Sequence, residues 1–189
     1  MQRISAADFR RMPWANGGGV TLELLRWPHP SRPDTFALRL SVADVEHGGP
    51  FSQFPGVDRW LGLLDGVGMA LRRETGQEAH LAEPGQTLAF CGEEGITCRL
   101  LGGAVRDFNL MLARDWAEGG LQRLVCPAGS ALIEPAADLT LLYLQTGRWL
   151  LGEETLAEPC LLLLESEAAS LLAQDDGVAW LCRVRRLQA

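Results

Sequence analysis

The sequence of 189 residues contains no lysine, and all 17 of its basic side chains are arginines. Lysine forms Schiff bases, holds phosphate in nucleotide-binding loops and acts as a general base when its pKa is lowered. None of these mechanisms is open to this chain. No serine lies in a Gly-x-Ser-x-Gly turn, so nucleophilic catalysis also lacks a sequence signature.

The chain has little that marks an oxidising or membrane environment. Its five cysteines form no Cys-x-x-Cys pair, and their odd number does not suit a disulfide framework. The stretch Met1–Trp14 lacks the apolar segment of a signal peptide, and the longest apolar blocks, such as Leu161–Leu164, are far too short to span a bilayer. We expect a soluble cytoplasmic protein with buried free thiols.

Positive charge is also in deficit. The 24 acidic residues outnumber the arginines and give a net charge of −7, with no basic stripe along the chain. Nucleic acid and anionic membrane surfaces attract concentrated positive charge, so the sequence predicts neither as a partner.

Glycine is abundant, with 21 residues, and the apolar runs are short and bounded by Gly, Pro or Asp, which is typical of strands and turns. One short helix is predicted at the start. Ser5-Ala6-Ala7-Asp8 has the spacing of a capping box, and this helix is expected to continue through Arg11 and stop before Pro13.

Three segments alternate between polar and apolar residues with a period of two, which indicates strands with one face in a core. They are 20–24, 36–42 and 107–112. Their polar faces carry Thr21 and Glu23, Arg39 and Ser41, and Asp107 and Asn109.

An internal repeat divides the chain. The first copy has a strand at 59–66, the string Leu-Ala-Glu-Pro at 81–84 and a closing strand at 96–101. The second has a strand at 139–147, the same string at 156–159 and a closing strand at 178–184. The repeat predicts two similar antiparallel barrels or sandwiches, an N-terminal half at 1–114 and a more apolar second half at 115–189, packed as one compact unit.

Three strings of residues carry a resemblance to a known family. They are Pro13-Trp-Ala-Asn-Gly-Gly-Gly-Val-Thr-Leu-Glu23, Gly49-Pro-Phe-Ser-Gln-Phe-Pro-Gly-Val-Asp-Arg59 and Asp107-Phe-Asn-Leu-Met111. In order and spacing they resemble the HutD/Ves family of bacterial bicupin-like proteins, and the resemblance covers the chain from the first helix to about Arg114. Ala15 departs from the family, which often has a lysine at this position.

The resemblance implies an all-β fold of the bicupin type, a double antiparallel β-barrel, and a link to histidine utilisation. Cupins that bind a catalytic metal hold it with a His-x-His pair, a Glu and a later His. This chain has only His29, His47 and His80, widely spaced, and Asp58-Arg59 stands where the pair would lie. We therefore expect neither a metal nor another cofactor.

The polar faces predict a ligand site in the first half. A charge inside a barrel needs a partner, so Arg39 requires Glu23, Asp107 or a ligand carboxylate, and an arginine fork suits carboxylates. The alternative is that these residues form only the wet face of a sheet. The expected ligand-binding residues are Asn16, Thr21, Glu23, Arg39, Ser41, His47, Phe51, Arg59, Asp107 and Asn109.

Several of these positions have two interpretations. The glycines 17–19 form either an anion-binding nest or a turn, and the loop 51–56 is either a wall of the pocket or a plug. Arg59 either projects inward or pairs with Asp58, and His47 is either a ligand donor or a surface residue.

Three functions remain open at this stage. The first is a small-molecule binding protein that regulates or assists histidine utilisation, with a small carboxylate such as formylglutamate or urocanate as ligand and no catalysis. The second is a metal-free isomerase, lyase or hydrolase, with Glu23 or Asp107 as general base. The third is an interaction module with a filled barrel. A homodimer is compatible with this fold.

Overall fold

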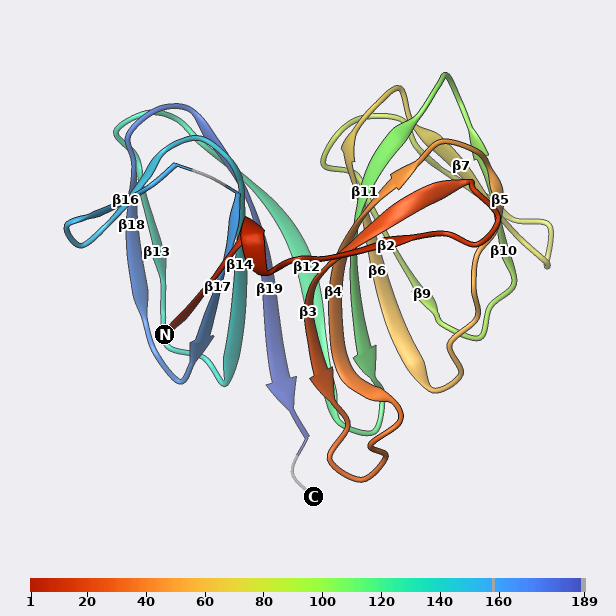
Figure 1. The fold of residues 1–189 in the computed structure, drawn as a ribbon, viewed down its shortest axis with the longest axis horizontal. Coiled ribbons are helices and arrows are strands. Elements are labelled where there is room, and N and C mark those ends of the chain that lie inside the picture. The colour runs from red at the N-terminus through yellow and green to blue at the C-terminus, as the bar shows by residue number, and fades with distance from the viewer. Residues whose placement is uncertain (158, 188–189) are drawn as a thin grey trace. The chain divides into compact units, whose positions relative to one another are not determined.

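The computed structural model describes residues 1–157 and 159–187 and is built from strands (Figure 1). The chain divides into two contact units. Unit 2 is the continuous segment Arg10–Ala117, and unit 1 combines Met1–Phe9 with Glu118–Ala189. The predicted halves, 1–114 and 115–189, differ from these units mainly at residues 1–9, because β1 (Gln2–Ser5) pairs with β17 (Cys160–Glu165) of unit 1.

Unit 2 contains two antiparallel sheets. The larger has the order β2-β3-β4-β11-β6-β9, and the smaller has the order β5-β10-β7-β8. The strands of the larger sheet are β2 (Arg10–Pro13), β3 (Gly19–Pro28), β4 (Phe36–Val45), β11 (Val105–Ala113), β6 (Val57–Asp65) and β9 (Thr87–Cys91). Those of the smaller sheet are β5 (Gly49–Pro50), β10 (Ile96–Leu100), β7 (Met69–Arg73) and β8 (Glu78–Leu81).

Unit 1 also contains two sheets, with the orders β1-β17-β14-β19-β12 and β13-β18-β15-β16. The remaining strands of the larger sheet are β14 (Leu139–Thr146), β19 (Gly177–Arg186) and β12 (Ala117–Cys126). Those of the smaller sheet are β13 (Ala131–Glu134), β18 (Ala169–Ala173), β15 (Trp149–Leu151) and β16 (Glu154–Leu156).

The internal repeat is visible in the topology. Adding eight to each strand number converts β4-β11-β6-β9 into β12-β19-β14-β17 and β5-β10-β7-β8 into β13-β18-β15-β16. One predicted correspondence is wrong, because the strand equivalent to β10 is β18, whereas β19 is equivalent to β11. The second string Leu-Ala-Glu-Pro includes position 158, which lies outside the described residues.

The all-β class predicted from the sequence is confirmed, but closed barrels are not seen. Among the described residues, the hydrogen-bonded ladders form two separate sheets in each unit rather than one continuous barrel wall. None of the described residues belongs to a helix that is long and apolar enough to cross a bilayer.

The predicted helix from Ser5 to Arg11 is wrong in length. Asp8 does accept hydrogen bonds from the Ser5 N–H and hydroxyl, but only one 3₁₀ turn, η1 (Ala6–Asp8), follows. Phe9 is then buried and its ring centroid lies 6.5 Å from that of Tyr143. Residues 10–13 pair with 20–23 as a hairpin, so strand pairing overrides the local capping signal.

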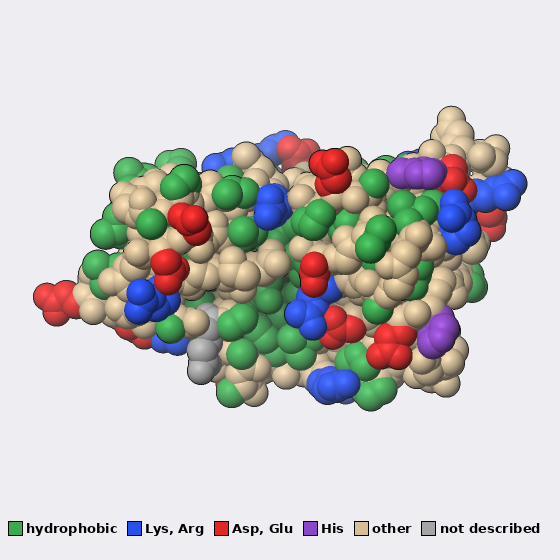
Figure 2. All heavy atoms as spheres, turned by 90° about the horizontal axis from the view of Figure 1, so that it is seen from above, with side chains coloured by type: hydrophobic (Ala, Val, Ile, Leu, Met, Phe, Trp, Pro, Cys, Tyr) green, Lys and Arg blue, Asp and Glu red, His purple; other side chains and the backbone are tan. Residues whose placement is uncertain are grey.

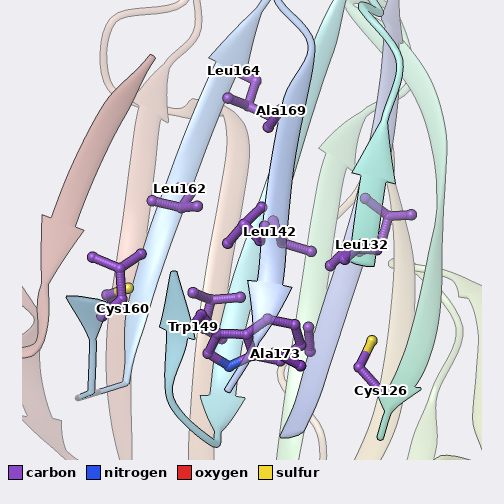
Figure 3. Close-up of a cluster of buried hydrophobic side chains, with 14 residues drawn as sticks. Cys126, Leu132, Leu142, Trp149, Cys160, Leu162, Leu164, Ala169 and Ala173 are labelled. Carbon is purple, nitrogen blue, oxygen red and sulfur yellow. The ribbon is translucent and has the colours of Figure 1, made fainter. Parts of the chain in front are cut away.

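The two units are filled differently. In unit 1, the space between the sheets is packed with apolar side chains such as Leu142, Trp149, Leu162 and Leu164 (Figure 3). In unit 2, Leu61, Leu63, Met69 and other apolar residues fill only part of this space. The polar positions of the first half therefore lie in the unit that is not packed solid.

Acidic and basic side chains are interspersed on the face of the molecule that Figure 2 shows. This distribution agrees with the many surface ion pairs between arginines and carboxylates, such as Arg106–Asp44 and Arg148–Asp175. Exposed pairs of this kind add little stability, about 0–1 kcal/mol each.

Candidate functional site

Unit 2 contains a cavity of about 480 Å³. Its lining comes from the strands β3, β4, β6, β10 and β11 and from two loops, one around Trp14 and Asn16 and the other running from His47 to Phe54. Nine of the ten predicted site residues line it, namely Asn16, Thr21, Arg39, Ser41, His47, Phe51, Arg59, Asp107 and Asn109. The tenth, Glu23, is not part of the lining but binds Arg39.

The strand register explains why residues so far apart in sequence converge. In the larger sheet of unit 2, Asn109 lies opposite Ser41 on one side and Leu61 on the other. Met111, two residues later and therefore on the same face, lies between Arg39 and Arg59. The cavity floor thus consists of rows of inward side chains across β4, β11 and β6.

Arg39 is neutralised within the protein. Its Nε donates a hydrogen bond of 2.6 Å to Glu23, and both side chains are largely buried, with 13% and 8% exposure. The sequence predicted that a buried Arg39 would need Glu23, Asp107 or a ligand, and Glu23 fills this role. Arg39 still lines the cavity, but its charge is already balanced.

Among the described residues that line the cavity, Arg59 is the cation without a carboxylate partner. It is only 4% exposed, and no carboxylate among the described residues lies within ion-pair distance of it. Within the part of the chain that the structure describes, its one hydrogen bond runs from Nη1 to the Ser52 carbonyl at 3.1 Å, and its Nε has no partner. Burial lowers its pKa to about 10, whereas the Asp107 charge opposes this shift. Arg59 therefore projects inward and does not pair with Asp58.

Three phenylalanine rings enclose this guanidinium. Its carbon lies 4.8 Å from the ring centroid of Phe90 and 5.4 Å from those of Phe51 and Phe54. Aromatic faces attract a cation and exclude water from it. The loop 51–56 thus contributes Phe51, Ser52 and Phe54 to the lining, and of its two predicted roles the structure favours the wall.

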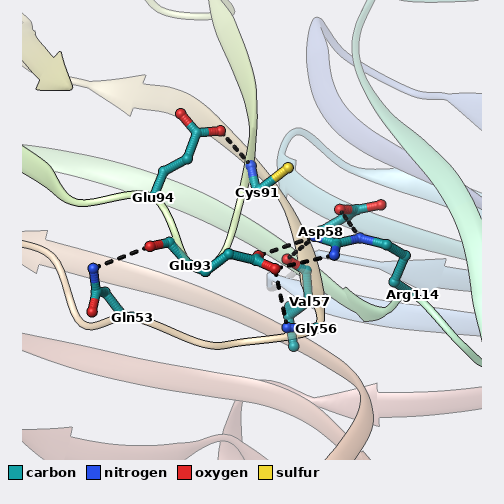
Figure 4. Close-up of polar contacts among 8 residues, drawn as sticks. All are labelled: Gln53, Gly56, Val57, Asp58, Cys91, Glu93, Glu94 and Arg114. Carbon is teal, nitrogen blue, oxygen red and sulfur yellow. Dashed lines mark hydrogen bonds and ion pairs between the residues drawn. The ribbon is translucent and has the colours of Figure 1, made fainter. Parts of the chain in front are cut away.

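A network of ion pairs holds this loop in place (Figure 4). Arg114 donates to Asp58 at 2.9 Å and to both carboxylate oxygens of Glu93 at 3.0 and 3.1 Å. Glu93 also accepts from the Gly56 N–H, and Gln53 donates to the Glu93 carbonyl. Hydrogen bonds from Arg114 lower the pKa of Glu93 to about 2. The network links the loop to the turn after β9.

Asp107 and Asn109 supply unpaired acceptors deep in the cavity. Asp107 is 2% exposed, and its Oδ1 and the Oδ1 of Asn109 have no hydrogen-bond partner in residues 1–157 and 159–187. Burial raises the pKa of Asp107 to about 7, against the lowering effects of Arg59 and of a hydrogen bond with Asn109. Asp107 forms no ion pair with Arg59 or with Arg39, so of the two protein carboxylates predicted as partners of Arg39, Glu23 is the one that binds it.

The glycine-rich segment forms a turn, not an anion-binding nest. The Gly17 N–H donates to the Trp14 carbonyl and the Gly18 N–H to the Asn16 side chain, so neither faces a ligand. Gly19 is required by packing, since a Cβ there would lie 2.3 Å from the Asp44 carbonyl oxygen.

The two loops at the cavity mouth are joined to each other. The Gly18 carbonyl accepts hydrogen bonds from the backbone N–H groups of Glu46 and His47. His47 itself is exposed and lines the mouth. On the other side, Trp14 donates from its indole to the Thr21 hydroxyl at 2.8 Å, which fixes the indole against the lining.

Some lining residues were not predicted. Met111 follows Asp107 and Asn109 on the same strand face, so extending the alternation by one step identifies it. Trp14 lies two residues before Asn16, in the first of the three strings that resemble the HutD/Ves family. Cys98 and the supporting Phe90 have no signal in the sequence, because apolar residues on strands are typical of any core.

The donor set of the cavity does not fit a metal ion. Among the described residues, no three His, Cys, Asp or Glu side chains lie close enough together to hold one. Within the lining, Cys98 and Asp107 both have raised pKa values, about 11 and about 7, which favour their protonated forms over the anionic forms that bind metals. The other histidines are elsewhere, with His29 bound to Asp115 and His80 to Glu78.

Solved structures with this fold are known. The chain resembles bacterial pirin YhhW from Escherichia coli, solved with nickel(II), with a TM-score of 0.74, 12% identity and coverage of 96% of this chain and 97% of that one. At this identity the likeness shows the fold alone, which is all-β and cupin-like.

Two further structures are more similar. A conserved protein of unknown function from Pseudomonas aeruginosa PAO1 has a TM-score of 0.83 and 32% identity over 99% of both chains. HutD from Pseudomonas fluorescens SBW25 has a TM-score of 0.82 and 28% identity, also over 99% of both chains.

The sequence comparisons agree with these structures. An uncharacterised 21.2 kDa protein in the hutC 3′ region of Pseudomonas putida is 41% identical over 144 residues, which are 72% of this chain and 74% of that protein. The family model described as HutD matches residues 6–181. The chain therefore belongs to the HutD family.

Proposed function

We propose that this protein binds a small carboxylate in the cavity of unit 2, without a metal, and acts as a regulator or accessory of histidine utilisation. Formylglutamate and urocanate are the candidate ligands. The family membership and the hutC neighbourhood in the name of the Pseudomonas putida relative support the metabolic link. We further propose that the two cupin-like units correspond to the two halves of a bicupin.

Arg59 is the observation that carries the proposal. A buried guanidinium that lacks a carboxylate partner is costly, and a bound carboxylate offsets that cost with charge-assisted hydrogen bonds. Arg39 is already paired with Glu23, so Arg59 is the stronger anion site. The Phe51, Phe54 and Phe90 rings restrict the guanidinium to one orientation.

The remaining lining residues suit the rest of a small polar ligand. Ser41 and Asn109 are buried and present a hydroxyl and an amide to the cavity. Asn16 and His47 lie at the mouth, where they can contact a ligand on entry. A cavity of about 480 Å³ is within the range typical of small-molecule sites, roughly 300–1,000 Å³.

Calorimetric titration tests the proposal. Formylglutamate, urocanate, formate and histidine are titrated into the wild-type chain and into Arg59→Gln. We expect heat of binding for at least one carboxylate, lost in Arg59→Gln. The control is Arg99→Gln, because Arg99 is exposed and lies outside the cavity lining. A folded wild-type protein that gives no heat with any of the four compounds contradicts the proposal.

A metal-free enzyme is the second candidate, and Asp107 favours it. A carboxyl group with a pKa of about 7 in a cavity with an arginine suits general acid–base chemistry near neutral pH. Glu23, the other predicted base, is held by Arg39. Turnover of a carboxylate that disappears in Asp107→Asn favours this function, whereas binding without turnover favours the first.

The cellular setting and the partners are also proposals. We place the protein in the cytoplasm, with a small carboxylate as its ligand and with no nucleic acid or membrane surface as a partner. The interspersed acidic and basic side chains on the face in Figure 2 support this view. A homodimer remains a prediction, which light scattering across a range of protein concentrations tests.

A further inference from the structure

Asp107 is a buried carboxyl group that has no ion-pair partner among the described residues. It lies on β11 in the cavity lining, 2% exposed, and its Oδ1 is shielded from solvent without a hydrogen-bond partner. Among the described residues, no cationic group lies within ion-pair distance of it. Asn109 opposes the rise in the pKa of Asp107.

The charged and titratable groups around Asp107 come from several elements. Arg59 on β6 favours its ionised form, whereas Asp44 on β4 opposes it. Asp44 is itself paired with Arg106 at 2.6 Å. Cys98 on β10 also feels the Asp107 charge, and its thiol has a pKa raised to about 11, so it stays neutral. His47 lines the mouth of the same cavity.

The charge balance of the cavity changes when an anion enters. Without ligand, Glu23 balances Arg39, which leaves the positive charge of Arg59 to stabilise an ionised Asp107 across the cavity. A carboxylate bound to Arg59 neutralises this charge and adds a negative charge near Asp107. In a dry cavity, two unbalanced carboxylates are costly, and one proton removes the cost.

We propose that the cavity takes up its carboxylate ligand together with one proton, which Asp107 receives. This inference rests on the proposed function and extends it to the regulation of the same site. The proton comes from solvent and binds a carboxylate oxygen of Asp107, while the ligand stays ionised on Arg59. The net charge of the cavity is then the same before and after binding.

Proton-coupled binding makes the site sensitive to pH. Above the pKa of Asp107 in the free protein, each rise of one pH unit weakens binding by up to about tenfold, because the required proton becomes scarcer. Below that pH, Asp107 is already protonated and the affinity is constant. The protein would thus respond to both its ligand and the pH of the cell.

Calorimetry in two buffers counts the protons. Formylglutamate, with formate as a minimal probe, is titrated at pH 8 in HEPES and in Tris, whose ionisation enthalpies differ widely. Any proton taken from the buffer appears as a difference in the observed enthalpy. We expect uptake approaching one proton per ligand in the wild-type chain and none in Asp107→Asn, which retains binding with little dependence on pH from 6 to 9.

Two further variants identify the proton acceptor. His47→Asn removes the imidazole that lines the cavity mouth, and we expect the proton uptake to persist in this variant. Asp44→Asn removes the carboxylate on β4 that raises the pKa of Asp107, and we expect this variant to retain proton uptake as well. Circular dichroism confirms that each variant is folded.

The outcomes separate this inference from the proposed function. If the wild-type chain binds with the same enthalpy in both buffers, the inference is wrong but carboxylate binding stands. The same holds if Asp107→Asn takes up as much proton as the wild-type chain. Loss of uptake in His47→Asn assigns the proton to His47 and also overturns the inference. If none of formylglutamate, urocanate, formate and histidine binds at any pH from 6 to 9, both proposals fail.

Discussion

At the scale of single residues, Asp107 links stability to pH. Its pKa rises from an ordinary value of 3.8 to about 7 in the folded chain, so folding favours the protonated form. The folded state binds more protons than the unfolded state between these pH values, and stability is lost as pH rises from about 4 to about 7. By pH 8, the raised pKa of Asp107 corresponds to a loss on the order of 4 kcal/mol in the free energy of unfolding.

Asp107→Asn should remove this loss. We expect the variant to gain stability relative to the wild-type chain as pH rises from 4.5 to 8, because its amide does not ionise. Urea unfolding of both proteins at the two pH values measures the difference. A stability difference that is equal at pH 4.5 and pH 8 would contradict the raised pKa.

Glu23→Gln should have opposite effects on stability and binding. The change leaves Arg39 buried without its countercharge, which should cost about 3 kcal/mol in the free energy of unfolding. It also frees a second guanidinium in the cavity, so we expect carboxylates to bind more tightly. Urea unfolding and calorimetry measure the two effects, and a weaker affinity in the folded variant would argue against an anion site.

At the scale of elements, the period-two alternation predicted which strand residues share a face. Thr21, Arg39, Ser41, Asp107 and Asn109 all reach the cavity, because side chains alternate along any strand with one buried face. The register between strands was not predictable. Nothing in the sequence says that Asn109 lies opposite both Ser41 and Leu61, since many registers satisfy the same alternation.

Local signals failed where pairing between strands decides the structure. The capping residues Ser5 and Asp8 predicted a helix, yet residues 10–13 form a strand with β3. The cation–π contact between Arg59 and Phe90 could not be predicted from the sequence either, because the two residues meet only when β6 pairs with β9.

The loop that carries Phe54 should depend on a residue that does not touch the cavity. Glu93→Gln weakens the contacts of Arg114 and of the Gly56 N–H that anchor this loop. We expect carboxylate affinity to fall severalfold in calorimetry, because the wall beside Arg59 becomes less well ordered. Glu83→Gln, exposed and outside the cavity lining, is the control. An unchanged affinity in Glu93→Gln would show that the wall needs no such anchor.

At the scale of the whole molecule, the repeated topology assigns different roles to similar units. The sequence predicted the repeat and the all-β class, and it predicted that any site would lie in the first half, where polar residues alternate. It could not predict that the first nine residues join unit 1, because pairing of β1 with β17 spans nearly the whole chain.

Because the proposed site lies in unit 2, a destabilising substitution in the core of unit 1 should leave carboxylate affinity unchanged. Leu142 is fully buried in the packed core of unit 1, and Leu142→Ala should cost about 2–5 kcal/mol of stability. Every residue of the cavity lining lies within Arg10–Ala117, so the carboxylate affinity of the folded variant should be unchanged. Urea unfolding and calorimetry on the same sample measure both quantities. A large loss of affinity would show that unit 1 shapes the cavity.

The most direct test of carboxylate binding at Arg59 is a crystal structure of the chain grown with formylglutamate. We predict a ligand carboxylate within hydrogen-bond distance of the Arg59 guanidinium, inside the cavity that Phe51 and Asn109 help to line. A ligand bound elsewhere on the protein, or bound in the cavity with no contact to Arg59, would contradict the proposed site.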